Sequence, residues 1–203
     1  MLFERRRPTN DLARRVEGLQ VEALQAMIPG EAATPLNQAG DLLMRAGDPL
    51  GALELYGQAV DSLIEADRFE AAIGLCNKII RTVPHVVRAR CTLAWLSIGA
   101  GFTGELPVRV SEYVSAAEKT GREMFALRHL RQMADVVDVH EVRILLGEYL
   151  LYLGDDVAAN SLFGEVYHER NSGHQRSIDM QERWRGVRQA ALLNMRKPTA
   201  AVA

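Results

Sequence analysis

The histidines and cysteines of this sequence are candidate residues for metal binding and redox chemistry. The five histidines are scattered, and only His168 and His174 are close enough to meet, across the turn "ERNSG". Two ligands are too few for a metal site, so we expect no metal or other cofactor. Cys76 and Cys91 flank Pro84, where a hairpin would bring the sulfurs to one level. We interpret them either as a redox pair or as two small buried apolar residues, and adopt the second because cytosolic disulfides are rare.

Catalytic sequence motifs are absent. The sequence contains no G-x-x-x-x-G-K-[ST], no G-x-G-x-x-G after a strand, no H-E-x-x-H and no G-x-S-x-G. These motifs cradle phosphates, bind dinucleotides, hold zinc or present a nucleophilic serine. We therefore expect a protein that is not an enzyme.

Composition and charge favour a helical, cytoplasmic protein. Apolar residues make up 48% of the 203 residues and aromatic residues only 6%, a balance that favours helix. The net charge of −2 argues against general nucleic-acid binding. An acidic body, net −7 over residues 31–168, precedes a basic tail, net +4 over 169–203. No apolar run approaches the roughly 18 residues that span a bilayer, and no signal peptide follows "MLFERRRPTND", so membrane binding is not expected.

Apolar residues recur with the 3.6-residue period of helices along nearly the whole chain. We predict about ten helices, bounded by capping residues, glycine and proline, at about 10–27, 36–46, 49–66, 68–82, 86–98, 106–119, 123–134, 138–153, 156–169 and 175–195. Asp48 is predicted to cap the third, and Asp67-x-x-Glu70 and Asp138-x-x-Glu141 are read as capping boxes. Alternating strand patterns are missing, so the predicted fold class is all-α.

Small residues stand among larger apolar ones in "AGDLLMRAGDPLGALELYGQAV", residues 39–60. Glycine inside a helix costs about 1 kcal/mol against alanine, so Gly40 and Ala52 indicate two helices of a hairpin in close contact, with a large residue filling the gap beside them. The pattern returns in "LLGEYLLYLGDDVAANSLFGEV" at the same separations, with Gly147 for Gly40, Gly154-Asp155 for Gly47-Asp48, Ala159 for Ala52 and Phe163 for Tyr56.

Half of this pattern recurs with Ala72 and Pro84, and the other half with Leu93-Ala94 and Gly101. The pattern resembles the tetratricopeptide repeat, a helix–turn–helix unit of about 34 residues. The family's early tryptophan is missing, and residues 102–137 fit poorly. The resemblance implies a right-handed α-solenoid of antiparallel helix hairpins over 33–172. An N-terminal helix and linker, 1–32, would precede it, and a basic capping helix with a frayed tail, 173–203, would follow.

The resemblance also implies a concave groove, lined by the first helix of each hairpin, that grips a peptide or helix of another protein. By this analogy the groove residues are Asn37, Asp41, Met44, Arg45, Asp61, Glu65, Arg88, Cys91, Thr92 and Trp95. Trp95 has a second possible place, the core, because tryptophan is well buried in either. The expected function is that of a non-catalytic adaptor or scaffold for a protein partner. The sequence also leaves open that the protein forms homo-oligomers.

The last predicted helix is basic and amphipathic. Trp184, Val187, Ala191 and Met195 form one stripe, and Arg183, Arg185 and Arg188 surround it. Either it caps the end of the repeats, or it docks an acidic partner or membrane surface. Two alternative functions follow. One is a structural subunit that contacts partners through its terminal helices, including Arg183, Trp184 and Arg188. The other is a regulatory nucleic-acid module that uses the basic tail, against which the acidic body argues.

Overall fold

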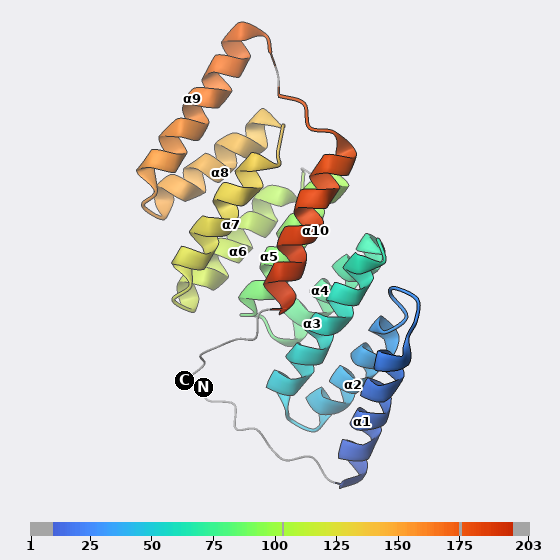
Figure 1. Cartoon of the computed structure of the whole chain (residues 1–203). Helices are drawn as coiled ribbons and strands as arrows, with labels where there is room; N and C mark the ends of the chain where they lie inside the picture. Colours follow the sequence, from blue (N-terminus) through green and yellow to red (C-terminus); the bar gives the residue numbers. More distant parts are fainter. Residues whose placement is uncertain (1–9, 103, 175, 197–203) are drawn as a thin grey trace. The chain divides into compact units, whose positions relative to one another are not determined.

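The computed structural model describes residues 10–102, 104–174 and 176–196, and in these ranges the chain is built of helices joined by short turns (Figure 1). The described helices are α1 (Asn10–Gln25), α2 (Ala33–Arg45), α3 (Pro49–Glu65), α4 (Phe69–Thr82), α5 (Val87–Ala100), α6 (Leu106–Lys119), α7 (Glu123–Asp135), α8 (His140–Tyr152), α9 (Asp156–Ser172) and α10 (Met180–Arg196). The all-α prediction is confirmed for this part of the chain. None of the helices described is both long and apolar enough to cross a bilayer.

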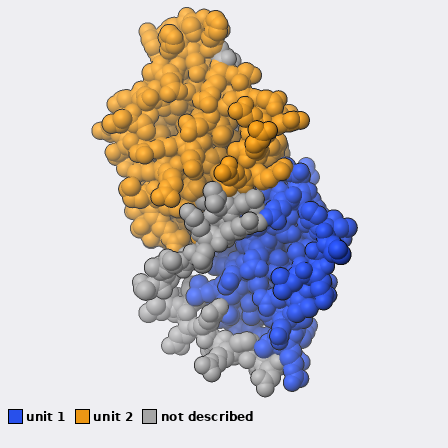
Figure 2. All heavy atoms as spheres, in the orientation of Figure 1, with its two compact units in different colours: residues 1–84, 191–203 blue, residues 85–190 orange. Residues whose placement is uncertain are grey.

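Contacts between Cα atoms divide the chain into two compact units (Figure 2). Unit 1 comprises residues 1–84 and 191–203, and unit 2 comprises residues 85–190. Within unit 1, helices α1 to α4 each pack against the next along the chain. Within unit 2, helices α5 to α9 do the same, and α5 also contacts α7 while α6 contacts α8. This mostly sequential packing is that of a helical array. The repeat region expected at 33–172 runs through both units.

Two helices begin three or more residues from their predicted start. Helix α2 starts at Ala33 rather than at residue 36 and includes Pro35. Proline is tolerated there because the first N–H groups of a helix have no partner within it. Helix α10 starts at Met180 rather than at residue 175. One Oδ2 atom, that of Asp179, accepts the backbone N–H groups of Gln181 at 3.0 Å and Glu182 at 3.4 Å, which caps the helix at this later point.

The hairpins α2–α3 and α8–α9 confirm the predicted role of the small residues. A Cβ atom added at Gly40 would lie 2.6 Å from the ring of Tyr56. A Cβ atom added at Gly147 would meet the ring of Phe163 in the same way. Ala52 and Ala159, the small residues of the second helices, are both fully buried. The two hairpins are therefore built on the same contact, an aromatic ring against a helical glycine.

The turns of these hairpins also match each other. Gly47 and Gly154 adopt φ values of +79° and +86°, which side chains other than that of glycine rarely tolerate. The aspartate that follows each glycine donates its N–H to a carbonyl five residues back, at 2.9 Å for Asp48 and 2.8 Å for Asp155. The Oδ1 atom of each aspartate then accepts the N–H three residues on, at 3.0 Å and 3.3 Å. The predicted Asp48 cap is confirmed.

Removal of this cap is expected to weaken unit 1. Asp48→Ala leaves an N–H of the first turn of α3 without its acceptor, and should lower the free energy of unfolding by about 1 kcal/mol. Asp48→Asn keeps an acceptor oxygen and should lose much less. Urea unfolding followed by far-UV circular dichroism measures both. Equal losses for the two variants would contradict the capping role.

The two predicted capping boxes are wrong. Asp67 has φ +56° and closes the end of α3, while Arg68 is the N-cap of α4 without a side-chain capping bond. Val139 is the N-cap of α8, likewise without such a bond. Asp138 instead accepts two hydrogen bonds from Arg183. Asp67 therefore belongs to the end of α3, and Asp138 accepts hydrogen bonds from Arg183. The local sequence motif predicted the wrong role for both.

Candidate functional site

Two of the expected groove residues, Asn37 and Asp41 on α2, meet side chains of α3 and α4 in unit 1. Lys78 Nζ donates to Asn37 Oδ1 at 2.7 Å and forms an ion pair with Asp41. The hydroxyl of Tyr56 donates to Asp41 Oδ1 at 2.5 Å. Lys78 Nζ also lies 4.7 Å from the centre of the Tyr56 ring, a cation–π distance. The four side chains form one polar cluster that joins three helices.

This cluster keeps Asp41 ionised. Burial raises the pKa of Asp41, but the hydrogen bonds from Lys78 and Tyr56 outweigh it, and the pKa of Asp41 lies below its ordinary value. Burial and the hydrogen bond to Asp41 raise the pKa of Tyr56, so its hydroxyl stays protonated and keeps donating. Asp41 is thus a negative charge whose orientation is fixed by Lys78 and Tyr56.

A hollow of 490 Å³ lies between α1 and α2, next to this cluster. Its lining residues are Arg15, Gly18, Leu19 and Glu22 of α1 and Gln38, Asp41, Leu42 and Arg45 of α2. Both signs of charge are present, and two leucines supply an apolar part. The predicted residues Asp41 and Arg45 therefore share one depression, together with α1 residues that were not expected there.

The other expected groove residues do not gather at this hollow. In unit 1, Met44 is half-buried, Asp61 is buried and Glu65 is exposed; in unit 2, Arg88 is half-buried and Cys91, Thr92 and Trp95 are buried. Cys76 is buried too. The cysteines thus fit the interpretation as small buried apolar residues. The side chain of Met195 lies outside the described part of the chain.

Trp95 occupies the second of its two expected places, the core. Its side chain is 1% exposed, and its indole Nε1–H points at Nδ1 of His129 at 3.3 Å. The ring of Phe125 lies 4.4 Å from that of His129, between ring centres. A substitution of Trp95 would therefore report on the folding of unit 2 rather than on a surface contact.

Helix α10 is divided between the two units, with residues 180–190 in unit 2 and residues 191–196 in unit 1. The residues that were expected to contact partners lie in its unit 2 part. Arg183 forms an ion pair with Asp138, Trp184 lies against Gly99 of α5, and Arg188 is half-buried. Val187, on the predicted stripe, is fully buried. Helix α10 therefore uses its apolar stripe within the chain.

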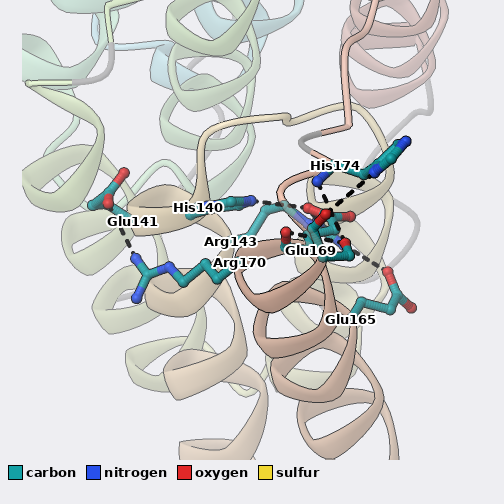
Figure 3. A network of polar contacts seen from close by, with 8 residues as sticks. His140, Glu141, Arg143, Glu165, Glu169, Arg170 and His174 are labelled. Atoms are coloured by element: carbon teal, nitrogen blue, oxygen red, sulfur yellow. Dashed lines mark hydrogen bonds and ion pairs between the residues drawn. The ribbon is translucent and has the colours of Figure 1, made fainter.

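The most deeply buried charge of unit 2 is Arg143 on α8, which sequence analysis did not single out. Its guanidinium donates to Glu169 Oε1 and Oε2 at 2.7 and 2.8 Å and to Glu165 Oε2 at 2.5 Å (Figure 3). His140 Nε2 lies 3.0 Å from Glu169 Oε2. The side chain of Arg143 is 0% exposed and that of Glu169 17%. This network joins α8 to α9, and we interpret its role as stabilising the hairpin.

Glu169 is expected to make unit 2 less stable in acid. Burial raises the pKa of Glu169, but bonds to Arg143 and His140 outweigh it and hold the pKa below the ordinary 4.5. A carboxylate whose pKa is lower in the folded state stabilises fully above the unfolded pKa, and this stabilisation is lost as the pH falls through the folded pKa. Glu169→Gln should cost about 1.5 kcal/mol at neutral pH, and the difference should vanish in acid.

Urea unfolding over a pH series tests this expectation. Both tryptophans of the sequence, Trp95 and Trp184, belong to unit 2, so their fluorescence follows that unit alone. Glu141→Gln is the matched control, because Glu141 makes an exposed ion pair with Arg170 and such pairs contribute little. A pH-independent deficit in Glu169→Gln would contradict the assignment.

Lys78 joins helices within unit 1 and Arg143 joins helices within unit 2. Sequence reasoning missed both residues. Each is a charged residue within an apolar helical stretch, "CNKII" for Lys78 and "EVRILL" for Arg143. Long charged side chains are rarely buried without a partner, so this position was the available signal. The partners themselves come from other helices and leave no local pattern.

Within the described ranges, no three side chains of His, Cys, Asp or Glu are close enough together to hold a metal ion. Comparison with protein-family models, with curated proteins and with solved structures finds no match to this chain. The described part of the chain is all-helical, with helices packed mostly in sequence order, and the hollow between α1 and α2 is the candidate functional site.

Proposed function

We propose that this protein is a non-catalytic helical-repeat adaptor, a degenerate solenoid of the tetratricopeptide type, which binds a protein partner at the hollow of unit 1. The observation that carries the proposal is the lining of this hollow, where arginines, acids and leucines of α1 and α2 surround one depression. Helical arrays present such surfaces to extended or helical segments of other proteins.

The lining indicates the chemistry of the partner segment. Leu19 and Leu42 supply an apolar contact, and Arg45 opposes an acidic group on the partner. Asp41 is already oriented by Lys78 and Tyr56, so little order is lost when it receives a basic group. The proposed occupant is therefore a cytoplasmic protein segment that carries one apolar side chain between an acidic and a basic residue.

Gly18 offers a direct test, because it lines the hollow and a Cβ added there meets nothing within 4 Å. Gly18→Phe should fill the hollow without disturbing the fold, and Arg45→Glu should reverse one charge. Gly74→Phe on α4 is the matched control, since Gly74 has equal space and lies outside the hollow. Proteins cross-linked to the full chain in its native source are quantified by mass spectrometry for each variant.

We expect at least one partner protein that is cross-linked to Gly74→Phe in the same amount as to the unsubstituted chain. Gly18→Phe and Arg45→Glu should reduce it at least tenfold, about 1.4 kcal/mol in binding free energy. The proposal fails if every protein is cross-linked to Gly18→Phe and Arg45→Glu in the same amount as to Gly74→Phe.

A second candidate function, a structural subunit that contacts partners through its terminal helices, is supported by apolar exposure at the end of α1. Leu24 and Met27 are 86% and 94% exposed, and Ile28 and Val21 are also exposed. Exposed apolar clusters often mark interaction sites. Mass measurement by light scattering should then show an assembly that Leu24→Glu with Met27→Glu dissociates. A monomer for both chains argues against self-assembly through this cluster.

A further inference from the structure

The face of unit 2 that α10 covers is shaped for a helix with a bulky side chain. Gly99 lies near the end of α5, and a Cβ added to it would clash with the six-membered ring of Trp184. In the opposite direction, a Cβ added to Gly186 of α10 would lie 3.1 Å from Cγ1 of Val136, just after α7. Each side therefore lacks a side chain where the other projects one, as in a fitted helix–helix contact.

Charge complementarity fixes the same contact. Arg183 Nη2 donates to both carboxylate oxygens of Asp138 at 2.8 Å, and both side chains are only 20% exposed. The backbone N–H of Ile178 donates to the same carboxylate at 3.4 Å. Upstream of α10, Arg176 Nη2 donates to the carbonyl of Asp135 at 2.6 Å. The turn between α7 and α8 thus receives basic groups from the segment that carries α10.

The attachment of α10 is a short segment without helix. Helix α9 ends at Ser172, Gly173 turns the chain with φ +69°, and the described residues between it and Met180 are not helical. The part of α10 that belongs to unit 2, residues 180–190, is consequently held there by its side-chain contacts and by a tether. A tether of this kind holds a ligand at an effective concentration on the order of millimolar.

We propose that this face, formed by Gly99, Val136 and Asp138, is a recognition site for an amphipathic helix that carries the pattern Arg-Trp-x-x-Val. In the intact chain α10 occupies the site with Arg183, Trp184 and Val187. A partner helix with the same arginine and tryptophan competes with α10 for it. Tryptophan and arginine are the residues that most often dominate interface energies, and an apolar face laid in a groove is a common mode of helix recognition. The site lies in unit 2 and is independent of the hollow proposed above.

The probe is a fluorescently labelled peptide with the sequence of residues 176–190, the unit 2 part of this segment, and binding is read as anisotropy. The full chain should bind it weakly, because its own α10 fills the site. The full chain with Arg183→Glu and Trp184→Ala should release α10 and bind the peptide at least tenfold more tightly. Arg185→Glu is the matched control, since Arg185 is exposed on the same helix, and it should behave as the unsubstituted chain. Peptides with Arg183→Glu or Trp184→Ala should not bind.

A second measurement avoids dependence on those substitutions. A protease site placed in the segment 173–179 allows the folded full chain to be cut between α9 and α10. The cut chain no longer benefits from the tether, so labelled peptide should exchange with α10 and binding should rise at least tenfold over the uncut chain. The proposal is overturned if the cut chain, still helical by circular dichroism, gains no peptide binding. Equal binding by the Arg185→Glu and Arg183→Glu, Trp184→Ala chains would overturn it as well.

Discussion

Arg143→Ala is expected to lower the free energy of unfolding of unit 2 by about 3–5 kcal/mol, the usual loss when one partner of a buried ion pair is removed. Arg143 is fully buried, and Glu169, its main partner, is largely buried. After the substitution the contact of Glu169 Oε2 with His140 Nε2, at 3.0 Å, remains. Glu165, which is 54% exposed, regains water and adds little to the loss.

Two further variants separate the ion pair from simple loss of volume. Arg143→Met with Glu169→Leu removes both charges and keeps apolar bulk, and replacements of this kind are often close to neutral. It should recover at least half of the loss. Arg170→Ala is the surface control, because Arg170 pairs with the exposed Glu141 and such pairs contribute about 0–1 kcal/mol.

Urea unfolding followed by tryptophan fluorescence measures these variants, since Trp95 and Trp184 both report on unit 2. The expected order of stability is the unsubstituted chain and Arg170→Ala, then the double variant, then Arg143→Ala. An Arg143→Ala chain as stable as Arg170→Ala would show that the buried network contributes nothing to folding.

Gly147→Ala is expected to destabilise unit 2 although alanine is the better helix former. In an exposed helix interior this exchange gains up to about 1 kcal/mol. At Gly147 the new Cβ meets the ring of Phe163, and overpacking of this kind costs about 1–3 kcal/mol. Gly164→Ala on α9 is the matched control, because it is exposed and a Cβ there meets nothing within 4 Å. Gly147→Ala should therefore lower the free energy of unfolding of unit 2, and Gly164→Ala should raise it.

The equivalent glycine of the first hairpin should be less tolerant still. Tyr56, which faces Gly40, is 1% exposed and bonded to Asp41, whereas Phe163 is only half-buried. Hydrogen exchange of α2 and α3 measures Gly40→Ala, with Gly74→Ala as the control. If Gly40→Ala and Gly147→Ala are both as stable as their controls, close approach of the helices is not the reason for these glycines.

Local patterns predicted the helices of this chain well. The 3.6-residue period and the glycine and proline signals place most boundaries within two residues, because they depend on neighbours in the sequence. The glycine and aromatic positions of the hairpins α2–α3 and α8–α9 were also predicted. A short turn fixes which residues of two helices face each other, so Gly40 and Tyr56 meet without help from the rest of the fold.

The candidate site was predicted only in part. Asp41 and Arg45 were expected at a groove and do line the hollow, but Arg15 and Leu19 of α1 were not expected there. The sequence did not decide whether Trp95 lies in the groove or in the core. The period of an amphipathic helix indicates which of its faces is buried. It carries no information on which other helix packs there, and this decides which side chains share a depression.

By itself, the sequence of this protein determined an all-α chain, most of the helix bounds and the internal contact of its two matching hairpins, since each follows from residues within one helix or across one turn. Only the tertiary structure decided which charges pair. Lys78 meets Asp41, Arg143 meets Glu169, and Asp138 receives Arg183 instead of capping α8. These pairs join residues 26 to 45 positions apart. The physical reason is that a charged side chain takes whichever opposite charge packing brings within reach, and packing depends on the whole unit.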